Sequence, residues 1–237
     1  MIYVMSDLHG NYEKYKEMLA LINFSDEDTL IINGDICDRG ADSVKIYMDI
    51  LSRNNVFAIK GNHELMAEVP LEILLKKYSD KEIDIASLMS EPDFWCWIDN
   101  GGITTLTSLF DVDSSLRLQI FEFIKKMPDY KIVYTKNKKF VILHGGINKT
   151  TDLAQLNKAD TYSLVWTRPD FDATYFNDEN TFLIVGHTPT ILINETTPAS
   201  IYHGKGNLIN IDCGAAYTEY GGRLGCLCLD TFEEFYV

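Results

Sequence analysis

The stretch Gly34-Asp35-Ile36-Cys37-Asp38-Arg39-Gly40 decides how the rest of this sequence is interpreted. It follows the apolar run Leu30-Ile31-Ile32, which is typical of a buried parallel strand, and it precedes residues 44–51, whose apolar spacing predicts a helix. Open α/β sheets bind ligands beyond the carboxyl ends of their strands, so this loop lies where chemistry is expected. Two carboxylates and an arginine framed by glycines suit a site for metal ions and phosphate.

Two neighbouring strand-to-helix junctions have the same construction. The apolar residues 2–5 and 56–59 lead to the polar tips Ser6-Asp7-Leu8-His9-Gly10 and Lys60-Gly61-Asn62-His63-Glu64. Asp7, Asp35 and Asn62 are separated by 28 and 27 positions, close to the roughly 30-residue length of a βαβ unit. Three successive parallel strands are therefore expected to bring these tips to one edge of a sheet.

Two later apolar runs also end in a histidine. Residues 140–143 precede His144-Gly145-Gly146, and residues 182–185 precede Gly186-His187-Thr188. Carboxylate, imidazole and amide oxygen together suit manganese, iron or zinc rather than a soft thiolate site. A two-metal site needs a carboxylate that bridges both ions. Asp35, which follows the middle one of the three N-terminal strands, is in the natural position for it.

In their order along residues 6 to 188, these motifs resemble the signature of the calcineurin-like metallophosphoesterases. The motifs are Asp-x-His-Gly, Gly-Asp-x-x-Asp-Arg-Gly, Gly-Asn-His-Glu, His-Gly-Gly and Gly-His-Thr. The resemblance is to the phosphoprotein phosphatase family, in its compact bacterial and phage branch. It implies an α/β fold with one domain over residues 1–237, in which residues 65–130 form a largely helical insertion or cap.

The periodicity of the sequence predicts strand–helix alternation first and strand-rich sequence afterwards. Helices are expected at 12–22, 41–53, 65–78 and about 115–126. Strands are expected at 132–134 and 140–143, as a hairpin, and near 182–185, 191–194, 207–211, 223–229 and 232–237. This order suggests the family's α/β/β/α sandwich, two mixed sheets flanked by helices.

The resemblance also implies a role for each motif residue. The first divalent ion would be bound by Asp7, His9 and Asp35. The second would be bound by Asp35, Asn62, His144 and His187. Manganese is expected in vitro, with iron or zinc as alternatives. A hydroxide that bridges the ions would attack phosphorus, Arg39 and Arg168 would bind the phosphate, and His63, oriented by Asp38, would protonate the leaving oxygen.

Several residues also have ordinary structural interpretations. Asp38 could cap a turn or helix, and Arg168 could be a solvated surface charge. Glu64 and Asp212 are expected to support the site, and His203 to lie at the surface. Residues 94–102 include a Trp-x-x-Asn-Gly-Gly stretch similar to one in bacterial phosphoprotein phosphatases. Its tryptophans either pack between helices or belong to a cap that selects substrates.

The composition of the chain indicates the compartment and the kinds of binding partner that suit this protein. The chain has 237 residues, of which 46% are hydrophobic, enough to fill the core of one α/β domain. Its net charge of −14 disfavours nucleic acids and anionic membranes as partners. No apolar run approaches the roughly 20 residues of a membrane span, and a strand that starts at residue 2 leaves no room for a signal peptide. Five cysteines without zinc-type pairing favour reduced thiols in the cytoplasm.

The implied function is a metal-dependent phosphomonoesterase that removes phosphate from phosphoserine or phosphothreonine in proteins. The alternative is a dinucleoside tetraphosphate hydrolase or another hydrolase of small phosphoesters. Dinucleoside tetraphosphate hydrolases typically lack the second aspartate of the central motif, so Asp38 favours the protein phosphatase. A polynucleotide-end phosphatase fits the acidic charge less well. A minor alternative is a non-catalytic phosphoprotein-binding module, although every ligand and acid position is filled. The oligomeric state stays open.

Overall fold

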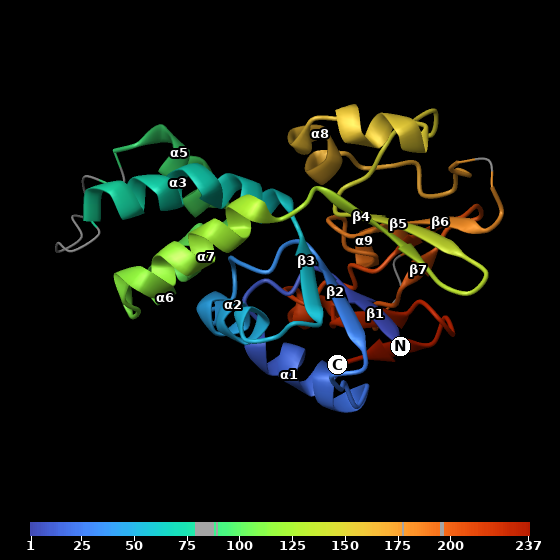
Figure 1. The fold of residues 1–237 in the computed structure, drawn as a ribbon, viewed down its shortest axis with the longest axis horizontal. Coiled ribbons are helices and arrows are strands. Elements are labelled where there is room, and N and C mark those ends of the chain that lie inside the picture. Colours follow the sequence, from blue (N-terminus) through green and yellow to red (C-terminus); the bar gives the residue numbers. More distant parts are fainter. Residues whose placement is uncertain (79–87, 89, 177, 195–196) are drawn as a thin grey trace.

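Two five-stranded sheets packed face to face form the centre of the computed structural model, which describes residues 1–78, 88, 90–176, 178–194 and 197–237 (Figure 1). The first sheet has the order β10-β9-β1-β2-β3. Its strands are β1 (Ile2–Met5), β2 (Thr29–Asn33), β3 (Val56–Ile59), β9 (Gly225–Cys228) and β10 (Glu234–Tyr236). β1, β2 and β3 are parallel, and β9 is antiparallel to β1 and β10.

The second sheet has the order β4-β5-β6-β8-β7. Its strands are β4 (Tyr130–Tyr134), β5 (Lys139–Leu143), β6 (Thr181–Val185), β7 (Tyr202–His203) and β8 (Leu208–Asn210). β5, β6 and β8 are parallel, while β4 and β7 run antiparallel at the edges. Both sheets are therefore mixed, and the predicted architecture is confirmed.

Alternating side chains along the strands fill three hydrophobic layers. Val4 of β1 and Ile142 of β5 belong to one buried cluster between the sheets. Met5, the next residue of β1, belongs to a cluster on the helix side of the first sheet. Leu143, the next residue of β5, belongs to a cluster on the outer side of the second sheet. Because consecutive residues of a strand point to opposite faces, both sheets are apolar on both sides and need helices as cover.

Helices cover the outer faces of the sheets. Those of the first half of the chain are α1 (Tyr12–Leu21), α2 (Ser43–Leu51), α3 (Asn62–Tyr78), α5 (Pro92–Trp97), α6 (Ile103–Phe110) and α7 (Ser114–Lys126). A π-helical turn, η1 (Ile98–Gly102), joins α5 to α6. The later helical segments are η2 (Leu153–Lys158), α8 (Thr161–Trp166), α9 (Ile191–Asn194) and η3 (Thr218–Tyr220).

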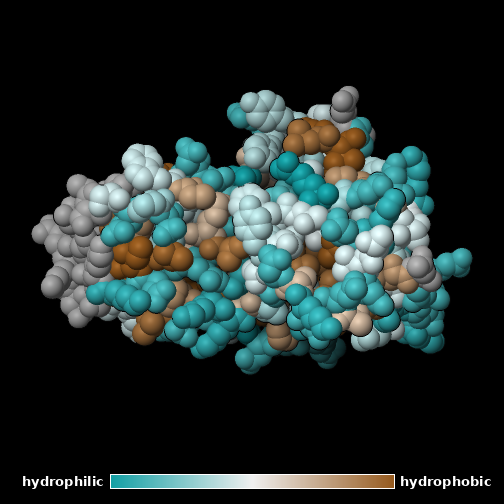
Figure 2. Space-filling view, turned by 90° about the horizontal axis from the view of Figure 1, so that it is seen from above, coloured by the Kyte–Doolittle hydropathy of each residue, from teal (hydrophilic) through white to brown (hydrophobic). Residues whose placement is uncertain are grey.

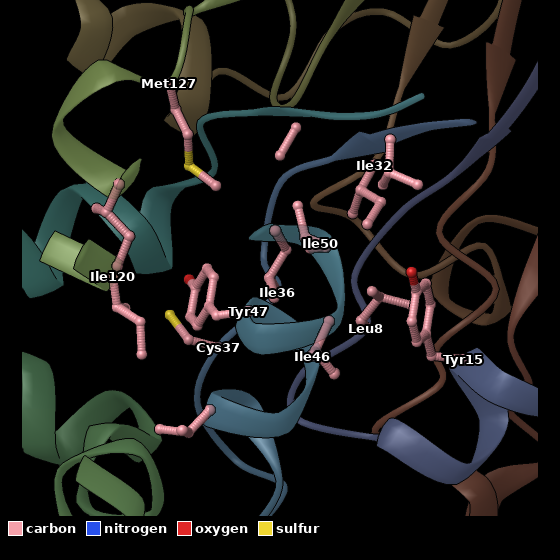
Figure 3. Close-up of a cluster of buried hydrophobic side chains, with 14 of the residues drawn as sticks. Leu8, Tyr15, Ile32, Ile36, Cys37, Ile46, Tyr47, Ile50, Ile120 and Met127 are labelled. Carbon is pink, nitrogen blue, oxygen red and sulfur yellow. The ribbon is translucent and has the colours of Figure 1, made fainter. Parts of the chain in front are cut away.

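The predicted insertion is helical where the structure describes it. α3, α5, α6 and α7 extend together to one side of the sheets (Figure 1), and α3 packs against both α5 and α7. Part of the predicted insertion, residues 79–87 and 89, lies outside the described residues. Figure 3 shows how the insertion joins the core, with Tyr47 of α2 beside Cys37 of the central motif and near Ile120 of α7. The motif loop is thus packed against buried side chains.

One predicted strand is wrong, because Ile191–Asn194 forms the short helix α9. The Leu192 N–H donates to the Pro189 carbonyl and the Ile193 N–H to the Thr190 carbonyl, each at 2.9 Å, so the chain turns directly after β6. Leu192 is 73% exposed, whereas a buried strand would cover it. Four apolar residues in a row do not distinguish a strand from a helical turn.

Other expectations are met with small shifts. α3 starts at Asn62 rather than at residue 65, so it begins inside the metal motif. All five cysteines are free thiols, and Cys226 and Cys228 are buried core residues. His203 lies at the surface, where its Nε2 is 2.6 Å from Glu234. Figure 2 shows a face on which hydrophilic residues surround smaller hydrophobic patches. Within the described ranges, we find no helix long and apolar enough to cross a membrane.

Candidate active site

Five strands, three from one sheet and two from the other, deliver polar motifs to a common site. The residues delivered by β1, β2, β3, β5 and β6 are Asp7, His9, Asp35, Asn62, His63, His144 and His187. The loops are joined by backbone hydrogen bonds from Asp7 to the Gly34 carbonyl, at 3.1 Å, and from His9 to the Asp35 carbonyl, at 2.9 Å. The structure therefore brings together the residues that the sequence places at strand ends.

The backbone of this site is held in an uncommon conformation. Its non-glycine residues with φ between 44° and 71° are Asp7, His9, Asp35, Asp38, Arg39 and His187. Few non-glycine residues adopt this left-handed region, which costs free energy and is found in functional sites. Gly34 and Gly61 allow the loops to approach each other. A Cβ atom on Gly34 would lie 2.5 Å from His144 Nδ1, and one on Gly61 would lie 2.2 Å from Asp35 Oδ1.

Glu64 holds the central loop in place. Its buried carboxylate accepts the N–H groups of Asp35 and Ile36, each at 2.8 Å, and that of Gly61 at 3.0 Å. The Tyr47 hydroxyl donates to the same carboxylate at 3.1 Å. A buried carboxylate needs such donors to offset its loss of water. These contacts are those of a supporting residue, as the sequence predicts for Glu64.

One group of ligand-type atoms surrounds Asn62. Its Oδ1 lies 3.0 Å from His144 Nε2 and 2.8 Å from His187 Nδ1. Asp35 Oδ1 lies 3.2 Å from His144 Nε2. Ligand atoms of Asp35, His144 and His187 all fall within 4.8 Å of one another. These are the four residues predicted to share the second ion.

A second group of ligand-type atoms lies on the other side of Asp35. Ligand atoms of His9, Asp35 and His63 fall within 4.8 Å of one another. His9 Nε2 is 3.6 Å from Asp35 Oδ2 and 4.0 Å from Asp7 Oδ1. Asp35 thus belongs to both groups, as a bridging carboxylate must. His63 also lies in this group, beside the predicted ligands His9 and Asp35.

Hydrogen bonds orient two of the imidazoles. His9 Nδ1 lies 3.0 Å from the Cys37 carbonyl, and His144 Nδ1 lies 2.8 Å from the Asn33 carbonyl. A carbonyl can only accept, so each Nδ1 carries a proton and each Nε2 faces the neighbouring carboxylates. Metal-binding histidines are commonly fixed in this way. Burial lowers the pKa of His9 well below its usual value. Burial, together with the neighbouring His144, lowers the pKa of His187 to about 3, so both rings are neutral at neutral pH.

Carboxylates dominate the electrostatics of the remaining site. Burial and the nearby Asp212 raise the pKa of Asp7 well above its usual value, and burial raises the pKa of Asp212 to about 6. Burial opposes the charge of His144, but Asp35 and Asp7 outweigh it and raise its pKa to about 10. Several carboxylates thus lie together in a buried volume, where a bound cation would stabilise their charged forms.

Asp38 and His63 form a buried pair at the rim of the site. His63 Nδ1 lies 2.7 Å from Asp38 Oδ2. On the other side of the ring, Nε2 lies 3.2 Å from a guanidinium nitrogen of Arg39. Arg39 is exposed, and its guanidinium carbon lies 5.3 Å from the ring centre of Tyr217. An arginine in this position can bind the oxygens of a phosphate group that lies next to His63 Nε2.

Arg168 occupies a different position from Arg39. It is exposed, and its charge contributes to the low pKa of His187. It borders a groove of about 330 Å³ whose other lining residues include Asn148, Lys149 and Asp170. The structure brings Arg168 to the margin of the site without a direct contact to the ligand groups described above.

Residues 1–217 match the calcineurin-like phosphoesterase family. The chain belongs to this family. A symmetrical bis(5'-nucleosyl)-tetraphosphatase from Wigglesworthia glossinidia brevipalpis is 30% identical over 156 residues, 65% of this chain and 47% of that protein. Serine/threonine-protein phosphatase 2 from Salmonella typhimurium is 29% identical over 169 residues, 70% of this chain and 67% of that protein.

The fold of the family is also found among solved structures. A protein serine/threonine phosphatase from Saccharomyces cerevisiae superposes with a TM-score of 0.56 at 17% identity, over 95% of this chain and 71% of that one. The match with the tetraphosphatases spans about half of their length, 47% in one case and 48% in another. These comparisons place the chain in the calcineurin-like phosphoesterase family, whose matched relatives are named as tetraphosphatases and as a serine/threonine-protein phosphatase.

A calcineurin-like phosphoesterase implies a pair of divalent ions, and the described residues fit such a pair. Asp35 is shared by two groups of ligand-type atoms, as a bridge requires. The Nδ1 atoms of His9 and His144 face backbone carbonyls, so their Nε2 atoms are turned toward the carboxylates, as in metal-binding histidines. Carboxylate, imidazole and amide donors together suit manganese, iron or zinc. The residues present thus fit the pair of ions that the family implies.

Some residues that contact the site were not assigned to it from the sequence, among them Trp97, Thr105 and Ser6. Trp97 and Thr105 of the insertion donate hydrogen bonds to Asp38, and Ser6 donates one to Asp7. The Trp-x-x-Asn-Gly-Gly stretch was a signal for Trp97, although its contact with Asp38 could not be deduced. Thr105 and Ser6 carry no such signal, because isolated hydroxyl residues occur throughout the chain.

Proposed function

We propose that this protein is a metal-dependent phosphomonoesterase that removes phosphate from phosphoserine or phosphothreonine residues of proteins. The buried Asp38–His63 pair carries this proposal, with 2.7 Å between Oδ2 and Nδ1. The alkoxide of serine or threonine is a poor leaving group, and its departure needs a proton donor. A histidine held by a carboxylate at the rim of a metal site supplies such a donor.

The proposed ligands follow the two groups of atoms that share Asp35. Asp7, His9 and Asp35 would hold one ion, and Asp35, Asn62, His144 and His187 would hold the other. Manganese is our choice for assays in vitro, and iron or zinc would suit the same donors. The chemistry that a pair of divalent ions supplies in such a site is activation of water as a nucleophile and neutralisation of phosphate charge.

The chain's own residues would bind the ester and move one proton. Arg39 and Arg168 would bind the phosphate oxygens, since guanidinium groups match them in shape and charge. Water would attack phosphorus as the bond to the serine or threonine oxygen breaks, with the two oxygens in line, and would release one proton to the solvent. His63 gives its Nε2 proton to the departing oxygen. Asp38 keeps the imidazole oriented through Nδ1 and stabilises its charged form.

A second candidate is hydrolysis of dinucleoside tetraphosphates. The relative from Wigglesworthia favours it, because it is named a symmetrical bis(5'-nucleosyl)-tetraphosphatase and is 30% identical to this chain. The same metal site would serve both reactions. A nucleotide leaving group needs less acid assistance than an alkoxide, so the Asp38–His63 pair favours the phosphomonoesterase.

The proposal extends to the surroundings of the protein. A phosphorylated protein or a small phosphoester is the proposed partner, while the net charge of −14 disfavours nucleic acids and anionic membranes. The free thiols of all five cysteines suit a reducing compartment, so we place the protein in the cytoplasm.

Metal removal and restoration test the proposed activity. The purified protein is stripped of metal, divided, and assayed for phosphate release from a phosphoserine peptide with and without added manganese. We expect release only in the presence of manganese. Asp35→Asn, which keeps the size of the side chain but removes its charge, is the matched control and should stay inactive. Manganese binding without release of phosphate from the peptide would contradict the proposal.

A further inference from the structure

Two side chains of the helical insertion donate hydrogen bonds to the carboxylate of Asp38. Trp97 Nε1 donates to both carboxylate oxygens of Asp38, at 3.0 Å from Oδ1 and 2.9 Å from Oδ2. The Thr105 hydroxyl donates to Oδ1 at 2.7 Å and accepts the backbone N–H of Asp38 at 2.8 Å. Asp38 is fully buried. Its carboxylate is thus shared by the general acid and two residues of the insertion.

Two glycines of the insertion make this close approach feasible. The Gly101 carbonyl accepts the backbone N–H of Arg39 at 3.0 Å, and Gly101 has a φ of 101°. A Cβ atom on Gly102 would lie 2.6 Å from three ring atoms of Trp97. Within one short stretch, Trp-x-x-Asn-Gly-Gly therefore provides both the indole N–H that bonds to Asp38 and the backbone carbonyl that bonds to Arg39.

We propose that Trp97 and Thr105 are positioning residues for the general acid, so that the insertion is part of the catalytic apparatus. This inference rests on the proposed function, in which His63 protonates the leaving oxygen. Neither residue touches the ester. Both act through Asp38, whose carboxylate plane sets the direction of the His63 ring and hence of its Nε2 atom.

The physical basis is the orientation of a buried carboxylate. The Trp97 and Thr105 donors together hold both oxygens of the Asp38 carboxylate, and this fixes the direction in which Oδ2 faces His63 Nδ1. If one donor is removed, the buried carboxylate loses a hydrogen bond, and no water can reach it to replace that bond. It then turns toward the remaining donors and takes the imidazole with it. A displacement of about 1 Å in a reacting group can lower a rate by about 100-fold.

If Trp97 and Thr105 position the general acid, the effect of replacing them on kcat should depend on the leaving group of the substrate. Proton transfer matters for an alkoxide or phenoxide, whereas p-nitrophenolate leaves without a full proton donor. Loss of positioning should therefore slow poor leaving groups selectively. Loss of packing or of metal should slow all substrates alike, so the comparison separates positioning from a structural role.

The variants are chosen to remove the polar group of one side chain at a time, the indole N–H of Trp97 or the hydroxyl of Thr105. Trp97→Phe keeps an aromatic ring and removes the indole N–H together with part of the ring volume. Thr105→Val keeps the shape of the side chain and removes the hydroxyl, and Thr105→Ser retains the hydroxyl as the conservative variant. Trp95→Phe is the matched control, since Trp95 is 58% exposed in the same helix and does not contact Asp38. Metal content and thermal unfolding are measured for each variant.

The assay compares phenyl phosphate, p-nitrophenyl phosphate and a phosphoserine peptide with manganese-loaded protein. We expect Trp97→Phe and Thr105→Val to lower kcat by about 10-fold or more on phenyl phosphate and the peptide. On p-nitrophenyl phosphate we expect a change of at most about 2-fold, with KM nearly constant throughout. Thr105→Ser and Trp95→Phe should behave like the wild type. If Trp97→Phe does not fold, the comparison of Thr105→Val with Thr105→Ser tests the positioning role.

Two results would overturn the inference. Equal losses on both aryl phosphates would show a structural role, and unchanged kcat in both variants would show no role. Failure of the proposed function appears separately. If the wild type hydrolyses aryl phosphates but not the peptide, the substrate class is wrong, while the leaving-group comparison still decides the positioning role. A wild type that hydrolyses none of the three substrates would overturn both.

Discussion

His63 Nδ1 lies 2.7 Å from Asp38 Oδ2, and both side chains are buried. His63 Nε2 also lies 3.8 Å from Asp35 Oδ2, in the group of ligand-type atoms that includes His9. Burial lowers the pKa of His63, but the carboxylates of Asp35 and Asp38 outweigh it, so the net pKa is raised. The position of His63 therefore allows it to act as a general acid or as a metal ligand. The two functions predict different results when His63 is replaced.

His63→Gln tests the function as an acid. We expect kcat for a phosphoserine peptide to fall by about 100-fold to 10,000-fold, the usual contribution of a general acid. We expect two manganese ions per chain to remain bound, because the proposed ligand sets do not include His63. Elemental analysis measures the metal content and phosphate release measures kcat. Loss of an ion together with activity would instead make His63 a ligand.

His144→Ala tests the metal site. His144 Nε2 lies within 3.2 Å of both Asn62 Oδ1 and Asp35 Oδ1, so its removal should weaken manganese binding by about 100-fold or more, since even supporting residues of metal sites contribute about 10-fold to 100-fold. Isothermal titration with manganese measures the change. His203→Ala, which removes the surface imidazole paired with Glu234, should bind manganese like the wild type. Equal affinity in both variants contradicts this ligand set.

Arg39→Lys tests phosphate binding. A lysine keeps the charge but loses the planar fork that pairs with two oxygens. We expect kcat/KM to fall by about 100-fold, as when one fixed donor to a developing oxyanion is removed. Arg168→Lys should cause a smaller loss, because Arg168 is exposed at the margin of the site. Steady-state kinetics on p-nitrophenyl phosphate make the comparison, and a larger loss for Arg168→Lys would reverse the two assignments.

Asp49→Asn tests a pH-dependent contribution to the stability of the fold at a position outside the site. Asp49 accepts hydrogen bonds from Tyr15 and Arg53. Burial raises the pKa of Asp49, but these partners outweigh it and the net pKa is lowered. The stabilisation is therefore present above about pH 4, the unfolded pKa of Asp, and is lost as the pH falls through the lower, folded value.

Urea unfolding at pH 7 and pH 3 measures this contribution. At pH 7, Asp49→Asn should lower the free energy of unfolding by about 1.5–3 kcal/mol, the range for hydrogen bonds to a charged group. The difference from the wild type should shrink at pH 3. Glu27→Gln, at an exposed position, should leave stability nearly unchanged. An effect of Asp49→Asn that is independent of pH would refute the electrostatic explanation.

Sequence reasoning succeeded where periodicity and strand ends coincide. Long apolar runs before Asp7, Asp35 and His144 predict strands with polar tips, and parallel pairing then fixes that these tips meet. The same reasoning failed at Ile191–Asn194. Four consecutive apolar residues have no period, and the turn after β6 depends on backbone hydrogen bonds from Leu192 and Ile193 that composition does not reveal.

The surroundings of Asp38 could not be predicted for a different reason. Trp97 and Thr105 lie 59 and 67 positions along the chain from Asp38, in an insertion whose packing is set by tertiary contacts. A buried tryptophan is expected from its hydrophobicity alone. Which polar group its N–H meets depends on the approach of Gly101 and Gly102 to the motif loop, and spacing does not determine that approach.

The central claim is that a phosphorylated side chain, not a dinucleotide, is the substrate. Its most direct test is the ratio of kcat/KM for a phosphoserine peptide to that for diadenosine tetraphosphate, measured on one manganese-loaded preparation. We predict a ratio of at least about 10 in favour of the peptide, because the Asp38–His63 acid assists a poor leaving group. A ratio below 1, with adenosine diphosphate as the product, would contradict the claim and leave the metal site assigned to a tetraphosphatase.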